Sequence, residues 1–121
     1  MSVSDTIRDM AIRARAAARQ LATVSGAQKN LALNKIADAI LANQAKLMEE
    51  NAKDLEQGKK DGLAGPLLTR LTLGEKKIAA MAQGLREIAL QVDPVGQTIE
   101  AYDRPNGLRI EKRRVPIGVV A

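Results

Sequence analysis

The sequence contains no cysteine and no histidine, and both absences narrow the chemistry available to the chain. Without cysteine there is no disulfide framework and no thiolate nucleophile. Without histidine the chain lacks the commonest general base and the commonest ligand of transition metals. The three serines, Ser2, Ser4 and Ser25, therefore have no histidine to activate them. We assign no catalytic residue, no cofactor-binding residue and no metal ligand from the sequence.

Large aromatic side chains are also nearly absent. There is no phenylalanine or tryptophan, and Tyr102 is the single tyrosine. The core must be built from leucine, isoleucine, valine, methionine and many alanines, which suits helices that approach closely. A length of 121 residues predicts one domain with a modest core.

Long apolar runs are missing as well, since none approaches the roughly 20 residues of a membrane span. The arginine-rich and alanine-rich start is reminiscent of a transit peptide, but Asp5 and Asp9 break the acid-poor rule and no apolar signal core is present. We therefore expect a cytoplasmic protein without membrane contact. Arg8, Arg15 and Arg19 share one face of the first helical pattern, and a basic outer face of a soluble helix is favoured over a membrane-surface helix.

Apolar residues recur at helical spacing through most of the chain. The pattern predicts helices near residues 4–22, 26–42, 44–57 and 73–91, with a further short segment that starts at Pro66. The predicted end signals are a cap at Ser4 or Asp5, capping boxes Ser25–Gln28 and Thr72–Glu75, a break at Asn43 and a C-terminal cap at Gly58.

The apolar period changes to alternation after about residue 97. "QTIEAYD" and "GLRIEKRR" flank "RPNG", and Asn-Gly between strands is a strong hairpin signal. Leu108, Ile110, Lys112 and Arg114 fall on one face of the second strand, while Arg109, Glu111 and Arg113 fall on the other. Since both faces are largely polar, we expect this ribbon to need a partner surface.

Positive charge is concentrated in the same region. The chain has a net charge of +5, and residues 104–114 carry five basic side chains and one acidic side chain. Such a patch fits phosphate or nucleic acid, or else a solvated or interface strand. The second interpretation is favoured, since only Tyr102 is available for stacking on bases. In "MEENAKDLEQ", Asn51 and Asp54 share a helix face and could hydrogen-bond to a loop. The glycines at 58, 62 and 65 are interpreted as turn residues, and no GxGxxG or phosphate-loop motif is present.

The last segment, residues 115–121, is rich in β-branched residues and predicts the start of a buried strand. Such runs belong in sheets that are covered on both faces, and a strand of this kind needs neighbouring strands. We therefore interpret residues 115–121 as the first strand of a truncated sheet.

Several stretches together resemble one family. "LNKIADAI" followed by "LMEENAKDLEQGKK" is similar to the N-terminal helices of the aldehyde dehydrogenase superfamily. "DGLAGPLLTRLTL", "DPVGQ" and "RPNGLRIEKRRVPIGVV" narrow the resemblance to the gamma-glutamyl phosphate reductase family, also called glutamate-5-semialdehyde dehydrogenases. The match runs in order along nearly the whole chain.

This resemblance implies an NADPH-dependent oxidoreductase of proline biosynthesis. Family members convert γ-glutamyl phosphate into glutamate 5-semialdehyde and phosphate, by attack of a cysteine on the acyl phosphate and hydride transfer to the thioester. They are several times longer, and this sequence has no cysteine, so no site residue carries over. We expect an N-terminal fragment or truncated product that is inactive alone.

The expected fold is mainly α, with a C-terminal β-hairpin and a truncated strand, inside an α/β aldehyde dehydrogenase-like parent. Residues 1–96 would form the helical part of the cofactor-binding domain, 97–114 an oligomerisation-type hairpin and 115–121 the first strand of the NADP-binding sheet. The resemblance implies homo-oligomers through the 98–114 hairpin. The alternative is a standalone basic helical module that binds nucleic acid or a protein partner.

Overall fold

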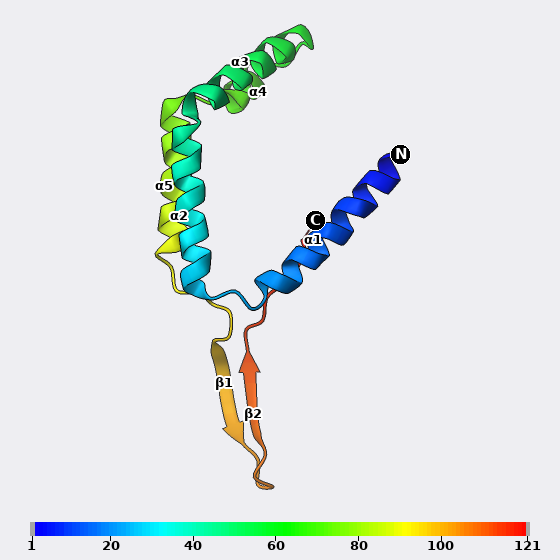
Figure 1. Ribbon diagram of the computed structural model, residues 1–121, viewed down its shortest axis with the longest axis vertical. Helices are drawn as coiled ribbons and strands as arrows, with labels where there is room; N and C mark the ends of the chain where they lie inside the picture. Colours follow the sequence, from blue (N-terminus) through cyan, green and yellow to red (C-terminus); the bar gives the residue numbers. More distant parts are fainter. Residues whose placement is uncertain (1, 121) are drawn as a thin grey trace. The chain divides into compact units, whose positions relative to one another are not determined.

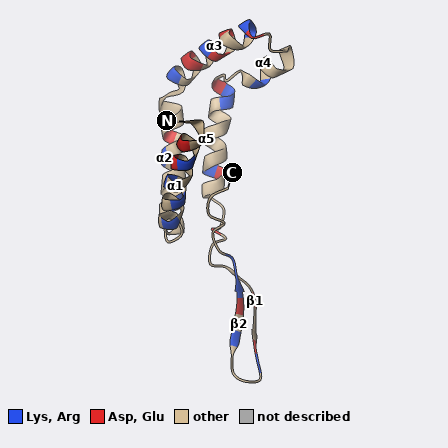
Figure 2. Cartoon of the chain, turned by 90° about the vertical axis from the view of Figure 1, so that its right-hand side faces the viewer, with Lys and Arg blue, Asp and Glu red and all other residues tan. Residues whose placement is uncertain are grey.

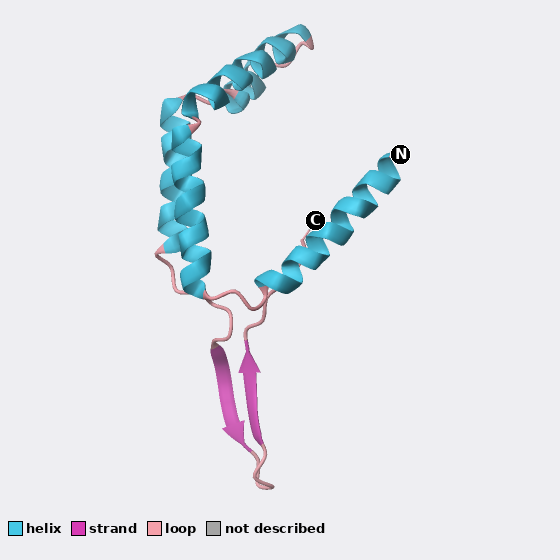
Figure 3. Ribbon diagram, in the orientation of Figure 1, coloured by secondary structure: helices cyan, strands magenta, loops and turns pink. Residues whose placement is uncertain are grey.

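The computed structural model describes residues 2–120, which form five helices and one two-stranded antiparallel sheet (Figures 1 and 3). The predicted mainly helical fold with a hairpin is confirmed. The described residues divide into two compact units, one formed by residues 27–91 and the other by the segments up to Gly26 and from Val92 onward. We call them the helical unit and the hairpin unit.

The helical unit begins with α2 (Gly26–Ala42), which lies alongside α5 (Glu75–Ala89) in Figure 1. On these two helices Ala37 and Ile78 are fully buried, and Ala82 is 1% exposed. At the edge of this contact, the Arg86 guanidinium donates to the Asp38 carboxylate at 2.7 Å. The buried apolar residues of the helical unit are mostly alanines, in agreement with the alanine-rich core expected from the sequence.

The end of α3 (Gln44–Lys60) corrects the role predicted for Gly58. Gly58 is a buried helical residue, and a Cβ placed on it would lie 3.3 Å from side-chain atoms of Leu63 and Leu68. Gly62 ends the helix instead, with φ of 73°. The N–H of Leu63 bonds to the Gly58 carbonyl at 2.9 Å and that of Gly62 to the Lys59 carbonyl at 3.1 Å, which is a Schellman motif.

The short helix α4 (Gly65–Leu71), with Pro66 in its first turn as predicted, is fastened by side chains from its neighbours. From α3, the Asn51 amide donates to the Leu71 carbonyl at 2.9 Å, and its oxygen accepts from the Leu73 N–H at 2.7 Å. From α5, the Lys77 ammonium donates to carbonyl oxygens of Thr69 and Thr72. The prediction that Asn51 bonds to a loop is confirmed.

The capping box predicted at Thr72–Glu75 is wrong. Gly74 is the N-cap of α5 and makes no side-chain cap. The Thr72 hydroxyl is already used, because it donates to the Leu68 carbonyl at 2.8 Å at the end of α4. The cap of the first helix is also displaced from the predicted position. Asn43 separates α2 from α3 as predicted, but it makes no side-chain cap.

In the hairpin unit, α1 (Val3–Leu21) is capped by Ser2 rather than by Ser4 or Asp5. The Ser2 hydroxyl accepts from the Asp5 N–H at 3.1 Å, and the Asp5 carboxylate accepts from the Ser2 N–H at 3.0 Å. This reciprocal pair is a capping box. The hydrogen bond from the Ser2 hydroxyl lowers the pKa of Asp5, so the carboxylate remains charged at the positive end of the helix.

The hairpin consists of β1 (Thr98–Asp103) and β2 (Arg109–Arg113), with a register irregularity between Thr98 and Glu100. Its turn differs from a two-residue Asn-Gly turn. The Gly107 N–H bonds to the Arg104 carbonyl at 2.9 Å, and Gly107 itself has φ of 82°. Pro105 and Asn106 therefore occupy the two central turn positions, and glycine follows them in the left-handed region that a side chain would strain.

Residues 115–120 form no strand, in contrast to the strand predicted for 115–121. A strand is defined by its ladder of hydrogen bonds, and β2 pairs only with β1, as far as Arg113. Ala121 lies outside the described residues. The assignment of this segment to a larger sheet stays a prediction.

Candidate functional site: the hairpin and a groove along the first helix

The described residues contain no group of three or more histidine, cysteine, aspartate or glutamate side chains that could hold a metal ion. The Ser2 hydroxyl is engaged with the carboxylate of Asp5. Across residues 2–120, no helix is both long enough and apolar enough to cross a membrane. The exposed surface of the hairpin unit carries the other residues singled out in the sequence.

Side chains of both charge signs lie on β2, as Figure 2 shows. The Glu111 carboxylate accepts from Arg109 Nε at 3.0 Å and from Arg113 Nε at 2.7 Å. These three residues share a face of the strand, as the alternation predicted. The hydrogen bonds from Arg109 and then Arg113 lower the pKa of Glu111. One acid thus holds two of the five basic side chains of this segment.

The remaining charges of the hairpin are also partly matched. Lys112 lies directly across from Glu100 in the ladder, and Arg109 lies across from Asp103. The Arg104 guanidinium carbon stands 5.4 Å from the centre of the Tyr102 ring, so a cation lies over one face of the single aromatic ring. The predicted basic patch is therefore a network with internal counter-charges. This arrangement fits an interface ribbon better than a phosphate-binding surface.

Apolar side chains of the hairpin unit lie unusually open. None of its described residues is buried. On α1 the exposed large side chains are Val3, Ile7, Met10, Ile12 and Leu21, and on the last segment they are Val115, Ile117, Val119 and Val120. Exposed apolar surface of this extent marks a site of contact with other protein surface.

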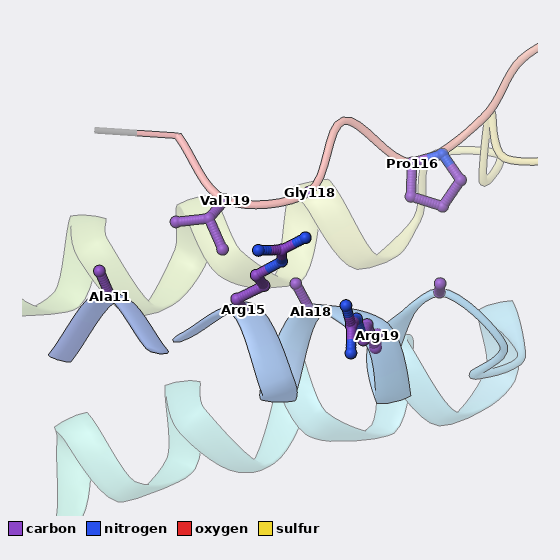
Figure 4. A pocket seen from close by; sticks show the side chains of 8 residues that line it. Ala11, Arg15, Ala18, Arg19, Pro116, Gly118 and Val119 are labelled. Carbon is purple, nitrogen blue, oxygen red and sulfur yellow. The ribbon is translucent and has the colours of Figure 1, made fainter. Parts of the chain in front are cut away.

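A groove runs between α1 and residues 116–119, as Figure 4 shows, with a volume of about 530 Å³. Ala11, Ala18 and Ala22 of α1 line one side of it, and Pro116, Gly118 and Val119 line the other. Arg15 and Arg19, one helical turn apart, also line the groove. We call this feature the α1 groove.

The sequence grouped Arg15 and Arg19 on one face of a helix but gave no sign of the groove. Periodicity identifies the faces of one element, whereas the groove depends on residues about a hundred positions away. Gly118, with φ of 90°, shapes the segment opposite the arginines. No residue pattern in the sequence indicates that this segment lies against α1.

The described residues form no strand–turn–helix phosphate cradle. A pyrophosphate cradle of the strand–turn–helix type needs a glycine-rich turn that leads from a strand into a helix N-terminus. The two strands of residues 2–120 both follow the last helix, so no such turn is formed there. Of the predicted turn glycines, Gly62 alone adopts the left-handed region, and it joins two helices.

We compared the chain with protein-family models, with curated proteins and with solved structures. No family model matches the chain. The chain is 51% identical over 114 residues to the gamma-glutamyl phosphate reductase of Rhizobium etli, and the match covers 94% of this chain and 27% of that protein. It is 47% identical over 120 residues to that of Desulfatibacillum aliphaticivorans, with 99% and 29% covered. The chain is homologous to gamma-glutamyl phosphate reductases.

Two solved structures agree with these relatives. The crystal structure of gamma-glutamyl phosphate reductase from Thermotoga maritima superposes with a TM-score of 0.86 at 33% identity, covering 90% of this chain and 26% of that one. The enzyme from Saccharomyces cerevisiae gives a TM-score of 0.80 at 38% identity, covering 92% and 28%. The resemblance predicted from the sequence is confirmed. The chain spans about a quarter of the length of these relatives.

Proposed function

We propose that this chain forms part of an NADPH-dependent gamma-glutamyl phosphate reductase, a cytoplasmic enzyme of proline biosynthesis with an aldehyde dehydrogenase-like α/β fold. The reaction converts γ-glutamyl phosphate into glutamate 5-semialdehyde and phosphate. The observation that carries the proposal is the 51% identity over 94% of the chain, supported by the TM-score of 0.86. Such identity along the whole chain reaches well beyond what a shared helical architecture requires.

Within that enzyme the described residues act as scaffold. The helical unit is held by the buried side chains of Ala37, Ile78 and Ala82. It is also held by the two hydrogen bonds of Asn51 to backbone groups at the end of α4, which we call the Asn51 clamp. The sequence contains no cysteine and no histidine, so in this proposal the thiolate chemistry depends on residues outside these 121. We accordingly expect this chain by itself to show no reductase activity and no tight NADPH binding.

A chimaeric enzyme tests the proposal directly. This chain replaces the matching 114 residues of the Rhizobium etli reductase, and activity is measured as phosphate-dependent reduction of NADP with glutamate 5-semialdehyde. We expect the chimaera to be active and the relative without that segment to be inactive. A chimaera that folds with native-like helix content but has no activity would refute the proposal. Activity of the 121-residue chain alone would equally overturn the scaffold role.

The hairpin supports a second part of the same proposal, homo-oligomerisation through residues 98–114. All side chains of β1 are exposed, both strands have an unpaired outer edge, and Ile99 is 53% exposed. A two-stranded ribbon without a covered face is marginally stable on its own. In the active chimaera, Ile99→Lys should weaken the assembly, while Gln91→Lys, outside the ribbon, should not. Sedimentation velocity measures both, and an unchanged oligomer in Ile99→Lys would contradict this role of the hairpin.

A further inference from the structure

The turn of the hairpin holds an asparagine whose side chain differs from the others in the chain. Asn106 is one of five asparagines and the only one that is followed by glycine. Its side-chain nitrogen donates to no described residue. In Asn34, Asn43 and Asn51 the same nitrogen donates to a backbone carbonyl, at 2.8–2.9 Å. The amide nitrogen of Asn106 is therefore free to leave in a substitution at its carbonyl carbon.

The backbone of the turn supplies both a hydrogen-bond donor and a nucleophile for this amide. The Leu108 N–H donates to the Asn106 side-chain oxygen at 3.2 Å. A donor at that place stabilises the negative charge that forms when a nucleophile adds to the carbonyl. The backbone nitrogen of Gly107 is the nucleophile, and its attack closes a five-membered ring. Because Gly107 has no Cβ, no side chain of its own crowds the attacking nitrogen.

Asparagines inside helices are kept from this reaction by their backbone. Asn30 and Asn34 lie in α2, and Asn51 lies in α3. Attack requires a rotation about the Cα–C bond of the asparagine, which would break the helical hydrogen bonds around it. The residues that follow these three asparagines also carry side chains, which crowd the attacking nitrogen.

We propose that Asn106 and Gly107 form a site of spontaneous deamidation. The Gly107 nitrogen bonds to the side-chain carbonyl carbon of Asn106, and the bond from that carbon to the amide nitrogen breaks. The amide nitrogen leaves as ammonia, with the proton of the Gly107 N–H. Water then opens the resulting succinimide at either of its two carbonyl carbons, which gives aspartate or isoaspartate at position 106. Every reacting atom except those of water belongs to these two residues, so the reaction needs no binding partner.

The closed turn controls the rate, because it holds the attacking nitrogen. The Gly107 N–H donates to the Arg104 carbonyl at 2.9 Å, and this bond must break before the nitrogen reaches the side chain. The Arg104 N–H in turn donates to the Leu108 carbonyl at 2.8 Å. A two-stranded ribbon is marginally stable, so the turn opens transiently and deamidation proceeds from the open form. We expect the reaction to be slower in the chain than in a free peptide of residues 102–109.

One of the two products changes the turn that fixes the register of the hairpin. Isoaspartate carries the main chain through its Cβ and side-chain carbonyl, so the backbone gains one methylene carbon between Arg104 and Leu108. The two hydrogen bonds of the turn then no longer close in the same geometry, and the pairing of Asp103 with Arg109 beside them is loosened. Both products add one carboxylate, so the net charge of +5 falls by one.

The test incubates the full 121-residue chain in mildly alkaline buffer made with heavy-oxygen water, followed by mass spectrometry of its proteolytic peptides. We expect the peptide that contains Asn106 to gain one heavy oxygen atom in place of an NH group. Both aspartate and isoaspartate should form, and fragmentation distinguishes them. Asn34 is the internal control, because it is exposed but lies in a helix. The rate at Asn106 should exceed that at Asn34 by at least about tenfold, since reaction at Asn34 requires a helical turn to open.

Two variants test the ring-closing step. Asn106→Gln keeps an amide in the turn but would require a larger ring, and we expect its rate to fall by at least about tenfold. Gly107→Ala strains the left-handed position and so favours the open turn, yet it should react more slowly because its methyl group crowds the nitrogen. The proposal is overturned if Asn106 keeps its amide while the free peptide of residues 102–109 reacts, or if Asn34 reacts as fast. It is equally overturned if aspartate forms without isoaspartate, or if Gly107→Ala reacts faster than the unmodified chain.

Discussion

Replacing Asn51 by alanine tests how the helical unit is held together. Asn51 is 8% exposed and spans from α3 to the segment after α4. Its amide donates to the Leu71 carbonyl at 2.9 Å and its oxygen accepts from the Leu73 N–H at 2.7 Å. Alanine would leave both backbone groups without these partners in a partly buried place.

The cost can be worked from those contacts. Each hydrogen bond contributes about 1 kcal/mol, and leaving a buried polar group unsatisfied adds to the loss, so we expect Asn51→Ala to lower the free energy of unfolding by about 2–3 kcal/mol. With an m-value of roughly 1 kcal/mol/M for a unit of this size, the urea midpoint should fall by about 2 M. The unfolding temperature should fall by roughly 10 °C or more.

Urea unfolding followed by circular dichroism at 222 nm measures the change. The matched control is Asn34→Ala, because Asn34 is exposed and its amide bonds only to the Asn30 carbonyl of its own helix, at 2.9 Å. We expect that variant to remain within about 0.5 kcal/mol of the unmodified chain. Equal destabilisation by both substitutions, or none by Asn51→Ala, would refute the assigned role of the clamp.

Three further predictions concern other elements. Gly58→Val should lower the free energy of unfolding by about 1–3 kcal/mol, because the new side chain is overpacked against leucine side chains. Gly84→Ala, which places a methyl group in open space within α5, should raise the free energy of unfolding by about 0.5–1 kcal/mol. Thermal unfolding measures both changes. The pKa of Glu111 is lowered in the folded hairpin, so its stabilising contribution is present above the ordinary pKa of 4.5 and is lost as the pH falls through the lowered value. NMR chemical shifts of β2 should follow this titration. The substitution Glu111→Gln should remove the titration from the spectra. Lys77→Met should destabilise α4 by about 0.5–1 kcal/mol, since a cation at the carbonyls of its last turn is removed, and hydrogen exchange of residues in that turn measures the effect.

Sequence periodicity predicted the helices and the hairpin because these elements depend on neighbours within a few residues. It failed where a distant side chain decides the outcome. Gly58 resembles a C-terminal cap in the sequence. In the structure, the side chains of Leu63 and Leu68 fill the space beside it, so that a residue without a side chain fits best there. Thr72 resembles an N-cap, but the preceding helix engages its hydroxyl. In both cases the local signal was present and a tertiary contact determined its use.

The candidate site shows the same division. The face of β2 that carries Arg109, Glu111 and Arg113 was visible in the sequence, and the structure adds that Glu111 pairs with both arginines. The α1 groove was not predictable, because residues 116–119 carry no pattern that points to α1. Their β-branched composition indicated a strand, and the structure instead shows them unpaired and exposed.

The contrast in burial between the two units constrains what the hairpin unit can do. Burying apolar surface contributes about 25 cal/mol per Å², and a segment gains this only when another surface covers it. The helical unit achieves this coverage with alanines and Ile78, whereas none of the described residues of the hairpin unit is buried. The hairpin, the outer face of α1 and the α1 groove must therefore gain their apolar contacts from protein outside the described residues.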